Sequence, residues 1–291
     1  MGEENEKLFG LIGTPLGHSL SSFLHQQIFV DLKISGCYHA FEISEERVEA
    51  ALEGMRALGF TGFNVTVPHK QRVIPYLDEK SPEVQATCAV NTVRIQAGRL
   101  LGFNTDVSGF SRALRSGNMF VNGSSAIILG AGGAARAVTF ALIQDGVKEI
   151  YLCNRSQDRA DQLVSEYSQS TGFNNFKVRD LRQDSILALL ERSEFIINAT
   201  SVGMWPNSET TPFEFSIKVK HMTAIDLVYN PLQTKFLLSA NKAGARVMDG
   251  LNMFLFQGIE SMQIWTARKI ALDVKKLRTK MIERLGIYEQ N

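Results

Sequence analysis

The hydrophobic positions of this chain switch repeatedly between two spacings. Short apolar and β-branched runs predict strands, and longer stretches with apolar residues at helical spacing predict helices. The strands expected in the first third are 8–12, 38–42, 63–67, 90–95 and 100–103. The helices expected between them are 22–32 and 45–58. This alternation predicts an α/β fold.

The middle of the chain keeps the alternation, but its strands become apolar throughout. Residues Ala126 to Leu129 form a continuous apolar run, which is typical of a parallel sheet covered on both faces. Further strands are expected at 149–153, 176–179, 195–199, 223–227 and 246–249. The expected helices are 158–167, 185–190, 234–243, 251–266 and 271–285. No flexible linker interrupts the pattern, so we expect two domains joined by helices.

A glycine-rich turn follows the run that ends at Leu129. Gly130, Gly132 and Ala135 match the spacing G-x-G-x-x-G/A between a predicted strand and a predicted helix. Gly130 would permit the tight turn, Gly132 would let a pyrophosphate approach the backbone, and Ala135 would let the helix pack on the strand. The phosphates would meet amide groups at the positive end of that helix. The motif predicts a dinucleotide site, with a plain turn as the alternative.

The next strand ends at Asn154-Arg155-Ser156, where an NAD-binding domain normally presents Asp or Glu to the ribose. Arg155 instead offers a planar cation to the 2′-phosphate of NADP. Arg159 would lie on the same face if a helix begins after Ser156. Two solvated surface arginines are the alternative. We therefore predict NADP(H) rather than NAD as the cofactor.

Composition excludes several other functions. The chain has 31 Lys and Arg against 30 Asp and Glu, so no strong field attracts nucleic acid or an anionic membrane. No window reaches the ~20 apolar residues that span a bilayer, and the acidic start does not resemble a signal peptide. Cys37, Cys88 and Cys153 have no metal-ligand spacing. We expect buried thiols, no metal and a cytoplasmic setting.

Two serines in the first third stand out from ordinary core or surface. Ser19 and Ser21 follow a predicted strand and a turn, so their hydroxyls could point together from an extended stretch. We expect the neighbouring His18 to orient or support this segment rather than to donate a proton.

A second polar segment surrounds Pro68. Asn64 and Thr66 are two residues apart, on one face of a predicted strand. Pro68 predicts the start of a helix, with Lys70 in its first turn, where a cation is unfavourable with the helix dipole. That local cost indicates a functional lysine. An ordinary surface lysine is the alternative.

Together these segments resemble the shikimate dehydrogenase family. The other matching segments are Ala199-Thr200-Ser201-Val202-Gly203-Met204, Tyr229-Asn230-Pro231, and Gly250-Leu251 with Met253 and Gln257. The resemblance runs from about residue 8 to the carboxyl end and rests on their order and spacing. It implies an α/β substrate-binding domain of residues 1–107 plus 250–291. It also implies a Rossmann-type, doubly wound NADP-binding domain of residues 108–249.

The resemblance implies reversible, NADPH-dependent reduction of 3-dehydroshikimate to shikimate, on the route to chorismate and the aromatic amino acids. It makes Lys70 and Asp106 the catalytic pair. The implied substrate-binding residues are Ser19, Ser21, Asn64, Thr66, Lys70, Asn91, Asp106, Tyr229 and Gln257. The implied cofactor-binding residues are Gly130, Ala131, Gly132, Gly133, Ala134, Asn154, Arg155, Ser156, Arg159, Thr200, Ser201, Leu227, Gly250 and Met253.

Each implied role has a structural alternative. Asp106 could serve as the N-cap of the following helix, Asn64 and Asn91 could satisfy turns, and Gln257 could be one polar position on a packed helix. Two positions depart from the usual family pattern. Ser156 replaces a common threonine but keeps the hydroxyl. Asn252 replaces a frequent glycine, and a positive φ there would be less favourable for asparagine.

Two other functions stay open at this point. One is a dehydrogenase of the same fold that prefers quinate or accepts both acids, because a pocket rejects one added hydroxyl only modestly. The other is a non-catalytic NADP-binding regulator that has kept the fold. In every case we expect a small-molecule ligand, no nucleic acid, no membrane, and a monomer or homodimer.

Overall fold

The computed structural model describes residues 6–17 and 19–288 and contains two six-stranded sheets. The chain divides into two compact units. The first runs to Thr105 and resumes over Leu255–Gly286, and the second covers Asp106–Phe254. The chain passes between the units at the start of helix α4 (Thr105–Ser116) and inside helix α9 (Leu251–Thr266). The units are therefore joined through helices, as the pattern predicts.

The first unit is built on a mixed sheet. Its strands are β1 (Lys7–Gly13), β2 (Gly36–Glu42), β3 (Gly62–Val65), β4 (Glu79–Lys80), β5 (Thr92–Gln96) and β6 (Arg99–Phe103), in the order β2-β1-β3-β5-β6-β4. Strand β1 is parallel to β2 and β3, whereas β5 is antiparallel to β3 and β6. The ends of β1, β3 and β6 therefore meet the start of β5 at one edge.

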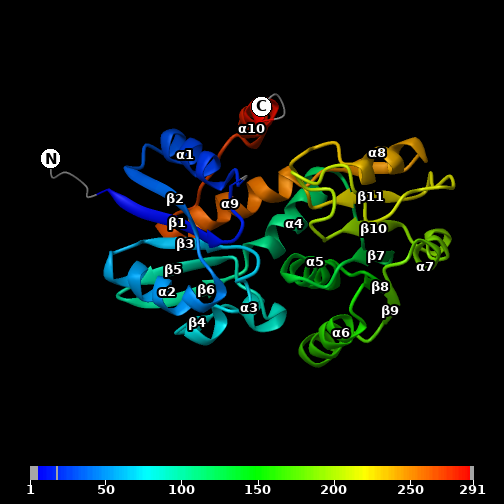
Figure 1. Ribbon diagram of the computed structural model, residues 1–291, viewed down its shortest axis with the longest axis horizontal. Coiled ribbons are helices and arrows are strands. Elements are labelled where there is room, and N and C mark those ends of the chain that lie inside the picture. The colour runs from blue at the N-terminus through cyan, green and yellow to red at the C-terminus, as the bar shows by residue number, and fades with distance from the viewer. Residues whose placement is uncertain (1–5, 18, 289–291) are drawn as a thin grey trace. The chain divides into compact units, whose positions relative to one another are not determined.

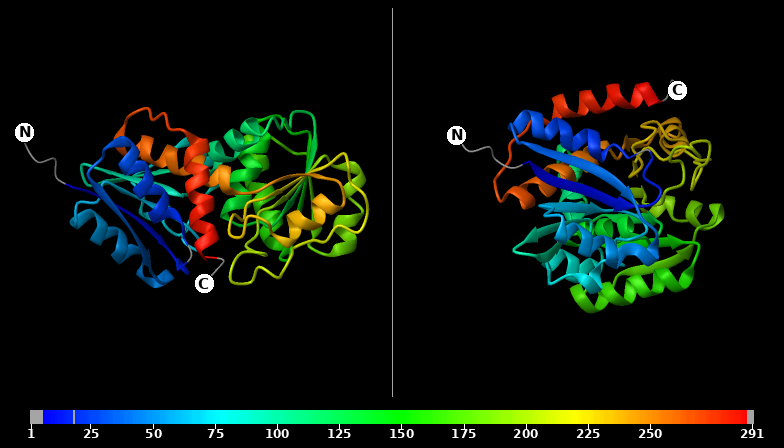
Figure 2. Two further views of the ribbon diagram at one scale, coloured as in Figure 1. Left: turned by 90° about the horizontal axis from the view of Figure 1, so that it is seen from above. Right: turned by 60° about the vertical axis from the view of Figure 1, so that its left-hand side comes forward.

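Helices cover both faces of this sheet. Besides α9, they are α1 (Ser21–Leu32), α2 (Val48–Ala57) after the 3₁₀ turn η1 (Glu45–Arg47), α3 (Pro82–Thr87) and α10 (Val274–Tyr288). The apolar positions Val48, Leu52 and Met55 of α2 pack into the core of one face, as their helical spacing predicts. Figure 1 and the right-hand view of Figure 2 show α1 and α2 on opposite sides of the sheet.

The prediction of a helix that begins at Pro68 is wrong. Residues 67–73 form consecutive turns, followed by the short 3₁₀ helix η2 (Ile74–Tyr76). Pro75 gives the physical reason. It has no N–H to bond the Gln71 carbonyl, so a helix from Pro68 could run no further than Ile74, about two turns, which is too short to be stable by itself. Lys70 therefore does not lie in the first turn of a helix, and the dipole argument for its function falls.

The second unit is built on an entirely parallel sheet. Its strands are β7 (Ser125–Leu129), β8 (Glu149–Asn154), β9 (Phe176–Asp180), β10 (Phe195–Asn198), β11 (Thr223–Asp226) and β12 (Arg246–Met248). They lie in the order β12-β11-β10-β7-β8-β9, and Figure 1 labels β11, β10, β7, β8 and β9 of this row. This is the doubly wound order, in which the chain starts at the centre and fills first one side and then the other. The Rossmann prediction is confirmed.

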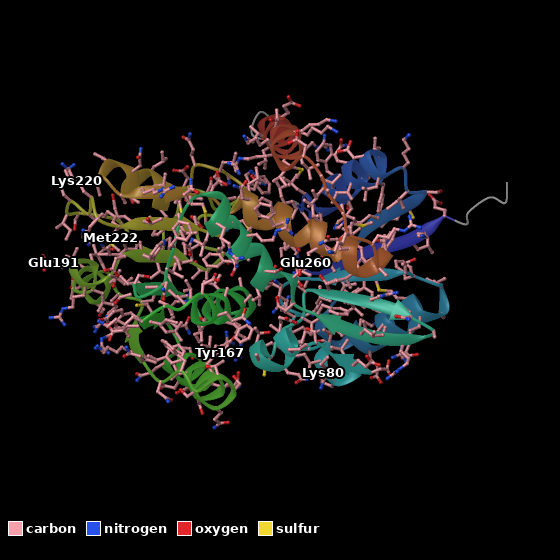
Figure 3. The ribbon with its side chains drawn as sticks, turned by 180° about the vertical axis from the view of Figure 1, so that it is seen from behind. Lys80, Tyr167, Glu191, Lys220, Met222 and Glu260 are labelled. Atoms are coloured by element: carbon pink, nitrogen blue, oxygen red, sulfur yellow. The ribbon has the colours of Figure 1, made fainter. Side chains whose placement is uncertain are left out.

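Helices also cover both faces of the parallel sheet, since residues 126–129 of β7 have no exposed surface. The helices are α4, α5 (Gly133–Gln144), α6 (Gln157–Thr171), α7 (Gln183–Leu187) and α8 (Lys235–Lys242), with the 3₁₀ turn η3 (Leu190–Arg192) after α7. An ion pair between Arg136 and Glu166 joins α5 to α6. Tyr167, labelled in Figure 3, donates from its hydroxyl to the Arg136 carbonyl at 2.8 Å.

The structure shows how far the cysteine side chains are buried and whether any described helix could span a membrane. Cys153 is buried, but Cys37 and Cys88 are only half-buried, because Cys37 lies on the edge strand β2 and Cys88 ends α3. The expectation of three buried thiols is therefore wrong for two of them. Over residues 6–17 and 19–288, every helix is too short or too polar to cross a membrane.

Candidate active site

The turn after β7 requires glycine at its first position. Gly130 has a φ of +105°, which residues with side chains rarely adopt. A Cβ there would lie 2.9 Å from Thr200 Cγ2 and 3.3 Å from the Ala199 carbonyl oxygen. Gly130 therefore lets the loop after β10 approach the turn, and it brings Thr200 beside the glycine-rich segment.

Gly132 is different, because nothing in the protein requires glycine there. It is the N-cap of α5 with φ −86° and ψ −172°, an extended conformation that any residue adopts. A Cβ would meet no atom within 4 Å. No side chain caps the helix, whose first residues are Gly133 and Ala134. The amides at this end of α5 can therefore receive an anion.

The arginines after β8 lie where the sequence predicts. Helix α6 begins at Gln157, and Ser156 caps it by accepting a bond from the Arg159 N–H at 3.5 Å. Asn154 Nδ2 donates to the Ser156 carbonyl at 2.8 Å and so tightens the turn. Arg155 and Arg159 are exposed, and neither forms an ion pair within the described part of the chain. Two positive charges therefore stand at this turn, with Asp158 between them in the first turn of α6.

The ends of β11 and β12 approach each other closely. A Cβ on Gly250 would overlap the carbonyl group of Leu227, so only glycine allows this approach. The ring of Tyr229 stacks on Phe254 at a centroid distance of 4.4 Å. Ser201 lies in the loop after β10, and Met253 is buried in the first turn of α9.

Asn252 occupies the second position of α9 with helical backbone. A residue in that conformation does not need the positive φ that glycine favours. The concern that asparagine would disturb the backbone here is therefore removed.

Three polar residues of this unit escaped the sequence analysis. Asn198, Asp226 and Thr234 are fully buried at or beyond the ends of β10 and β11. Burial raises the pKa of Asp226 to about 7, and Asp249 acts in the same direction. Hydrogen bonds from Thr234, Val228 and Asn198 oppose that rise. The available signal was an acidic residue at the end of an apolar strand.

The two serines of the first unit lie together, although not on extended chain. Ser21 is the first residue of α1, which corrects the expectation of an extended segment. Ser19 Oγ donates to Ser21 Oγ at 3.1 Å and accepts from the Ser21 N–H at 3.3 Å. The pair stands at the amino end of α1, a favourable place for an anion. His18 lies outside the described residues.

Backbone hydrogen bonds hold Thr66 and Lys70 at the end of the sheet where β1 and β3 end and β5 begins. Thr66 follows β3, and its N–H donates to the Ile12 carbonyl at 2.9 Å. The Lys70 carbonyl accepts from the Val90 N–H at 2.8 Å. This bond fixes the backbone of Lys70 beside Val90, which precedes Asn91 in the chain. Both side chains are partly exposed.

Asn64 is buried, and hydrogen bonds engage its side chain from several directions. Tyr38 Oη donates to Asn64 Oδ1 at 2.8 Å. Asn64 Nδ2 lies 3.0 Å from the Asn91 carbonyl oxygen, 3.1 Å from Thr92 Oγ1 and 3.0 Å from Ser261 Oγ. Asn64 thus joins β3 to β5 and α9, beneath the edge that carries Thr66.

Asn91 links the start of β5 to α4 and α9. The Thr105 N–H donates to Asn91 Oδ1 at 2.8 Å, and this fixes the direction of the amide because a backbone N–H can only donate. Asn91 Nδ2 then donates to Thr105 Oγ1 at 2.8 Å and to Gln257 Oε1 at 3.3 Å. The oxygen of the Gln257 amide therefore faces Asn91.

Asp106 follows Thr105 directly and is buried in the first turn of α4. The helix begins at Thr105, so Asp106 is its second residue and the N-cap explanation is wrong. A carboxylate in a first turn still interacts favourably with the helix dipole.

Over the described ranges, no three residues among His, Cys, Asp and Glu gather as a metal site would require.

The chain matches two family models in succession. Residues 11–93 match the shikimate dehydrogenase substrate binding domain, and residues 114–227 match shikimate / quinate 5-dehydrogenase. A curated relative, shikimate dehydrogenase (NADP(+)) of Bacillus cereus, is 39% identical over 97% of this chain and 99% of its own length.

Solved structures agree with these matches. A shikimate dehydrogenase crystallised with NADP⁺ is 35% identical, covers 98% of each chain and gives a TM-score of 0.89. The quinate dehydrogenase of Corynebacterium glutamicum in complex with NAD is 30% identical over 96% of this chain and 99% of its own, with a TM-score of 0.86. By its fold, its motifs and its similarity over nearly the whole length, the chain belongs to the shikimate dehydrogenase family.

Proposed function

We propose that this protein is an NADP-dependent shikimate dehydrogenase, which reversibly reduces 3-dehydroshikimate to shikimate with NADPH. The observation that carries the proposal is the polar edge of the first sheet. There the ends of β1 and β3 lie beside the start of β5, and polar side chains follow or precede these strand ends: Ser19, Ser21, Thr66, Lys70 and Asn91. A polyol acid needs this mixture of groups. The proposed domains are residues 1–107 plus 250–291 for substrate and 108–249 for cofactor.

The substrate carboxylate would bind at the amino end of α1, where Ser19 and Ser21 add hydroxyls to the backbone amides. Thr66, Asn91 and Gln257 would bind the ring hydroxyls. Because the Gln257 oxygen faces Asn91, its Nε2 is the end that would donate to substrate. Asn64 and Tyr229 complete the proposed set.

The cofactor would lie across the carboxyl ends of the parallel strands, at the switch point between β7 and β10. Its pyrophosphate would meet the amides from Gly130 to Ala134 at α5. Gly132 supports this assignment because the protein itself leaves the space beside it open. The proposed remaining contacts come from Asn154, Arg155, Ser156, Arg159, Thr200, Ser201, Leu227, Gly250 and Met253.

Arg155 and Arg159 would pair with the 2′-phosphate. The absence of a carboxylate at the end of β8 favours NADP over NAD, since a ribose with free hydroxyls would gain nothing from two cations.

The bound cofactor would supply the hydride that reduces the C3 ketone. Lys70 would donate the proton that the developing alkoxide needs, and in the reverse direction it would accept that proton. Asp106 would orient the reacting hydroxyl and the Lys70 ammonium. Such a positioned pair would supply acid and base catalysis.

Quinate is the second candidate substrate, because the chain is also similar to a quinate dehydrogenase. Quinate adds one hydroxyl at C1, so discrimination depends on the groups around the carboxylate. We expect the closely spaced serines to favour shikimate, which lacks that hydroxyl.

Steady-state rates with shikimate and quinate, each with NADP⁺ and NAD⁺, test the proposal. We expect the highest kcat/KM for shikimate with NADP⁺. A preference for quinate would replace the proposed substrate. Binding of NADPH without turnover of either acid would indicate a regulator. Light scattering tests our expectation of a monomer or homodimer, and fractionation of source cells tests the expected cytoplasmic location.

A further inference from the structure

Asp226 is a fully buried carboxylate that the proposed reaction does not use. It ends β11, and its Oδ1 accepts from Asn198 Nδ2 at 2.9 Å and from the Val228 N–H at 3.0 Å. Its Oδ2 accepts from Thr234 Oγ1 at 2.6 Å. A buried carboxylate is costly, so three well-placed donors indicate that hydrogen-bond acceptors are needed at this position.

Asn198 extends this cluster into the loop after β10. Its Oδ1 accepts from the Thr200 N–H at 3.0 Å and from Thr200 Oγ1 at 2.7 Å. Its Nδ2, besides bonding Asp226, donates to the Val202 carbonyl at 3.1 Å. Asn198 therefore fixes the conformation of the loop that carries Thr200, and Asp226 ties that loop to β11.

The same carboxylate reaches two further segments. The Val228 N–H belongs to the loop after β11, between Leu227 and Tyr229. Thr234 is the N-cap of α8, where its Oγ1 also accepts from the Leu237 N–H at 3.3 Å. One side chain thus holds the loop after β10, the loop after β11 and the start of α8.

These loops lie on one side of the switch point. A doubly wound domain binds the two halves of a dinucleotide over its two halves of the sheet. Arg155 and Arg159 follow β8, which assigns the phosphorylated adenosine to the side of β7, β8 and β9. The nicotinamide half therefore belongs to the side of β10, β11 and β12, where Asp226 ties the loops.

We propose that Asp226 is a positioning residue for the nicotinamide half of the cofactor site and acts through the loops that carry Thr200 and Leu227. The inference rests on the proposed function for its cofactor assignment. The alternative is that Asp226 only stabilises the domain. The two differ in what they leave intact, because the arginines after β8 have no hydrogen bond to this cluster.

Two ligands separate these possibilities. NADPH occupies both halves of the site, whereas 2′,5′-ADP occupies only the adenosine side. For Asp226→Ala we expect NADPH affinity to fall about tenfold or more and kcat to fall by about 10²-fold, as small misplacements near reacting atoms do. We expect 2′,5′-ADP affinity to stay within about twofold. Fluorescence titration and calorimetry provide these values.

A conservative variant tests whether geometry or charge is required. In Asp226→Asn, the amide oxygen can accept the two N–H donors while the amide nitrogen faces Thr234 Oγ1. We expect this variant to keep NADPH affinity and kcat within about threefold of wild type. Losses equal to those of Asp226→Ala would overturn a role in geometry.

Met222→Ala provides the matched control. Met222 is 1% exposed, packs in the core of the same sheet and precedes β11 at its opposite end (Figure 3). We expect a lower melting temperature and an unchanged ratio of NADPH to 2′,5′-ADP affinity. If Asp226→Ala does not fold, Asn198→Ala breaks the same tie between loops and should give the same selective loss.

Equal weakening of both ligands, or wild-type NADPH affinity and kcat in a folded Asp226→Ala or Asn198→Ala variant, would overturn the inference. The ligand ratio needs no shikimate. A wild-type enzyme that binds NADPH but does not oxidise shikimate would therefore refute the proposed function while the binding data still decide the role of Asp226.

Discussion

We propose that the choice between NADP and NAD depends most on Arg155. It is exposed after β8, with no ion-pair partner among the described residues, and it replaces the usual ribose-binding carboxylate. Arg155→Asp removes a charge-assisted contact and adds a repulsive charge, so we expect KM for NADP⁺ to rise roughly 10 to 100-fold. KM for NAD⁺ should change much less. Parallel steady-state assays with both cofactors measure the difference.

Arg192→Asp is the control for that prediction, because Arg192 is exposed in the same unit but precedes the amino end of β10, whereas Arg155 follows the carboxyl end of β8. It should leave both cofactors unaffected. A wild-type enzyme that uses NAD⁺ as well as NADP⁺ would contradict the assignment of Arg155 and Arg159.

The serine pair predicts a selective effect on the substrate. Ser19→Ala or Ser21→Ala removes one hydroxyl from the pair at the amino end of α1, so KM for shikimate should rise by about a hydrogen bond, roughly fivefold. KM for NADP⁺ should stay nearly constant. Ser22→Ala, a neighbouring serine outside the pair, is the control. Equal increases in both KM values would point to misfolding instead.

Lys70 and Asp106 carry the prediction about the chemical step. Lys70→Ala should lower kcat by about 10² to 10⁴-fold, with a far smaller effect on KM for shikimate, because proton transfer by a positioned group contributes that much. The carbonyl bond that holds its backbone to Val90 survives the substitution, so folding should persist. Rapid-mixing measurements of NADPH oxidation separate the chemical step from binding.

Asp106→Asn tests its partner. Since Asp106 is not the N-cap of α4, loss of a cap cannot explain a large decrease in kcat. If the two residues act together, the double variant should lose much less than the product of the single losses. A Lys70→Ala enzyme with wild-type kcat and pH profile would remove Lys70 from the mechanism.

At the scale of the element, the turn before α5 contains two glycines with opposite requirements. Gly132→Val should leave the melting temperature nearly unchanged, because its backbone is extended and its Cβ space is empty. The same change should raise KM for NADP⁺ more than about tenfold by blocking the pyrophosphate. Gly130→Ala should instead destabilise the fold by about 1 to 2 kcal/mol.

Thermal melting together with NADPH titration checks both variants. If Gly132→Val bound NADPH normally, the assignment of the pyrophosphate to this turn would be wrong.

His25 in helix α1 should make the stability of the protein depend on pH. His25 is 1% exposed and stacks on Tyr38, and burial lowers its pKa from 6.5 to about 3 although a bond to Asn64 opposes the shift. Between pH 6.5 and about 3, His25 is therefore protonated in the unfolded chain but neutral in the folded chain. The stability that depends on neutral His25 is present above pH 6.5 and is lost as the pH falls toward 3.

We expect this group alone to lower the free energy of unfolding by about 2 kcal/mol between pH 7 and pH 5. Urea denaturation of wild type and His25→Phe at both values measures it. The variant should lose less stability over that interval than wild type does. Parallel losses would show that His25 is not held neutral.

Sequence patterns predicted the elements whose structure depends on residues that are neighbours in the chain. The apolar run 126–129, the glycine turn and Ser156 before α6 were located because burial, positive φ and capping each select residue types locally. The turns around Lys70 were not, because Pro68 resembled a helix start while Pro75, further along the chain, prevents one. Local rules cannot weigh such competing signals.

At the scale of the whole molecule, the family resemblance supplied what spacing could not. Asn91 and Gln257 are far apart in sequence, yet Asn91 donates to Gln257 at 3.3 Å. Asn198, Asp226 and Thr234 were missed for the same reason, since their significance lies in mutual hydrogen bonds between separate loops. Such contacts depend on which strands and loops are neighbours in space. The hydrophobic pattern predicted the strands but not their detailed arrangement.

The central claim is that this chain transfers a hydride from NADPH to C3 of 3-dehydroshikimate. Reduction with NADPH deuterated at C4, followed by mass spectrometry and NMR of the product, measures that transfer directly. We expect shikimate with one deuterium at C3, and no deuterium at that carbon when unlabelled NADPH is used in D₂O. Failure to form shikimate, or shikimate labelled from solvent and not from the cofactor, would contradict the claim.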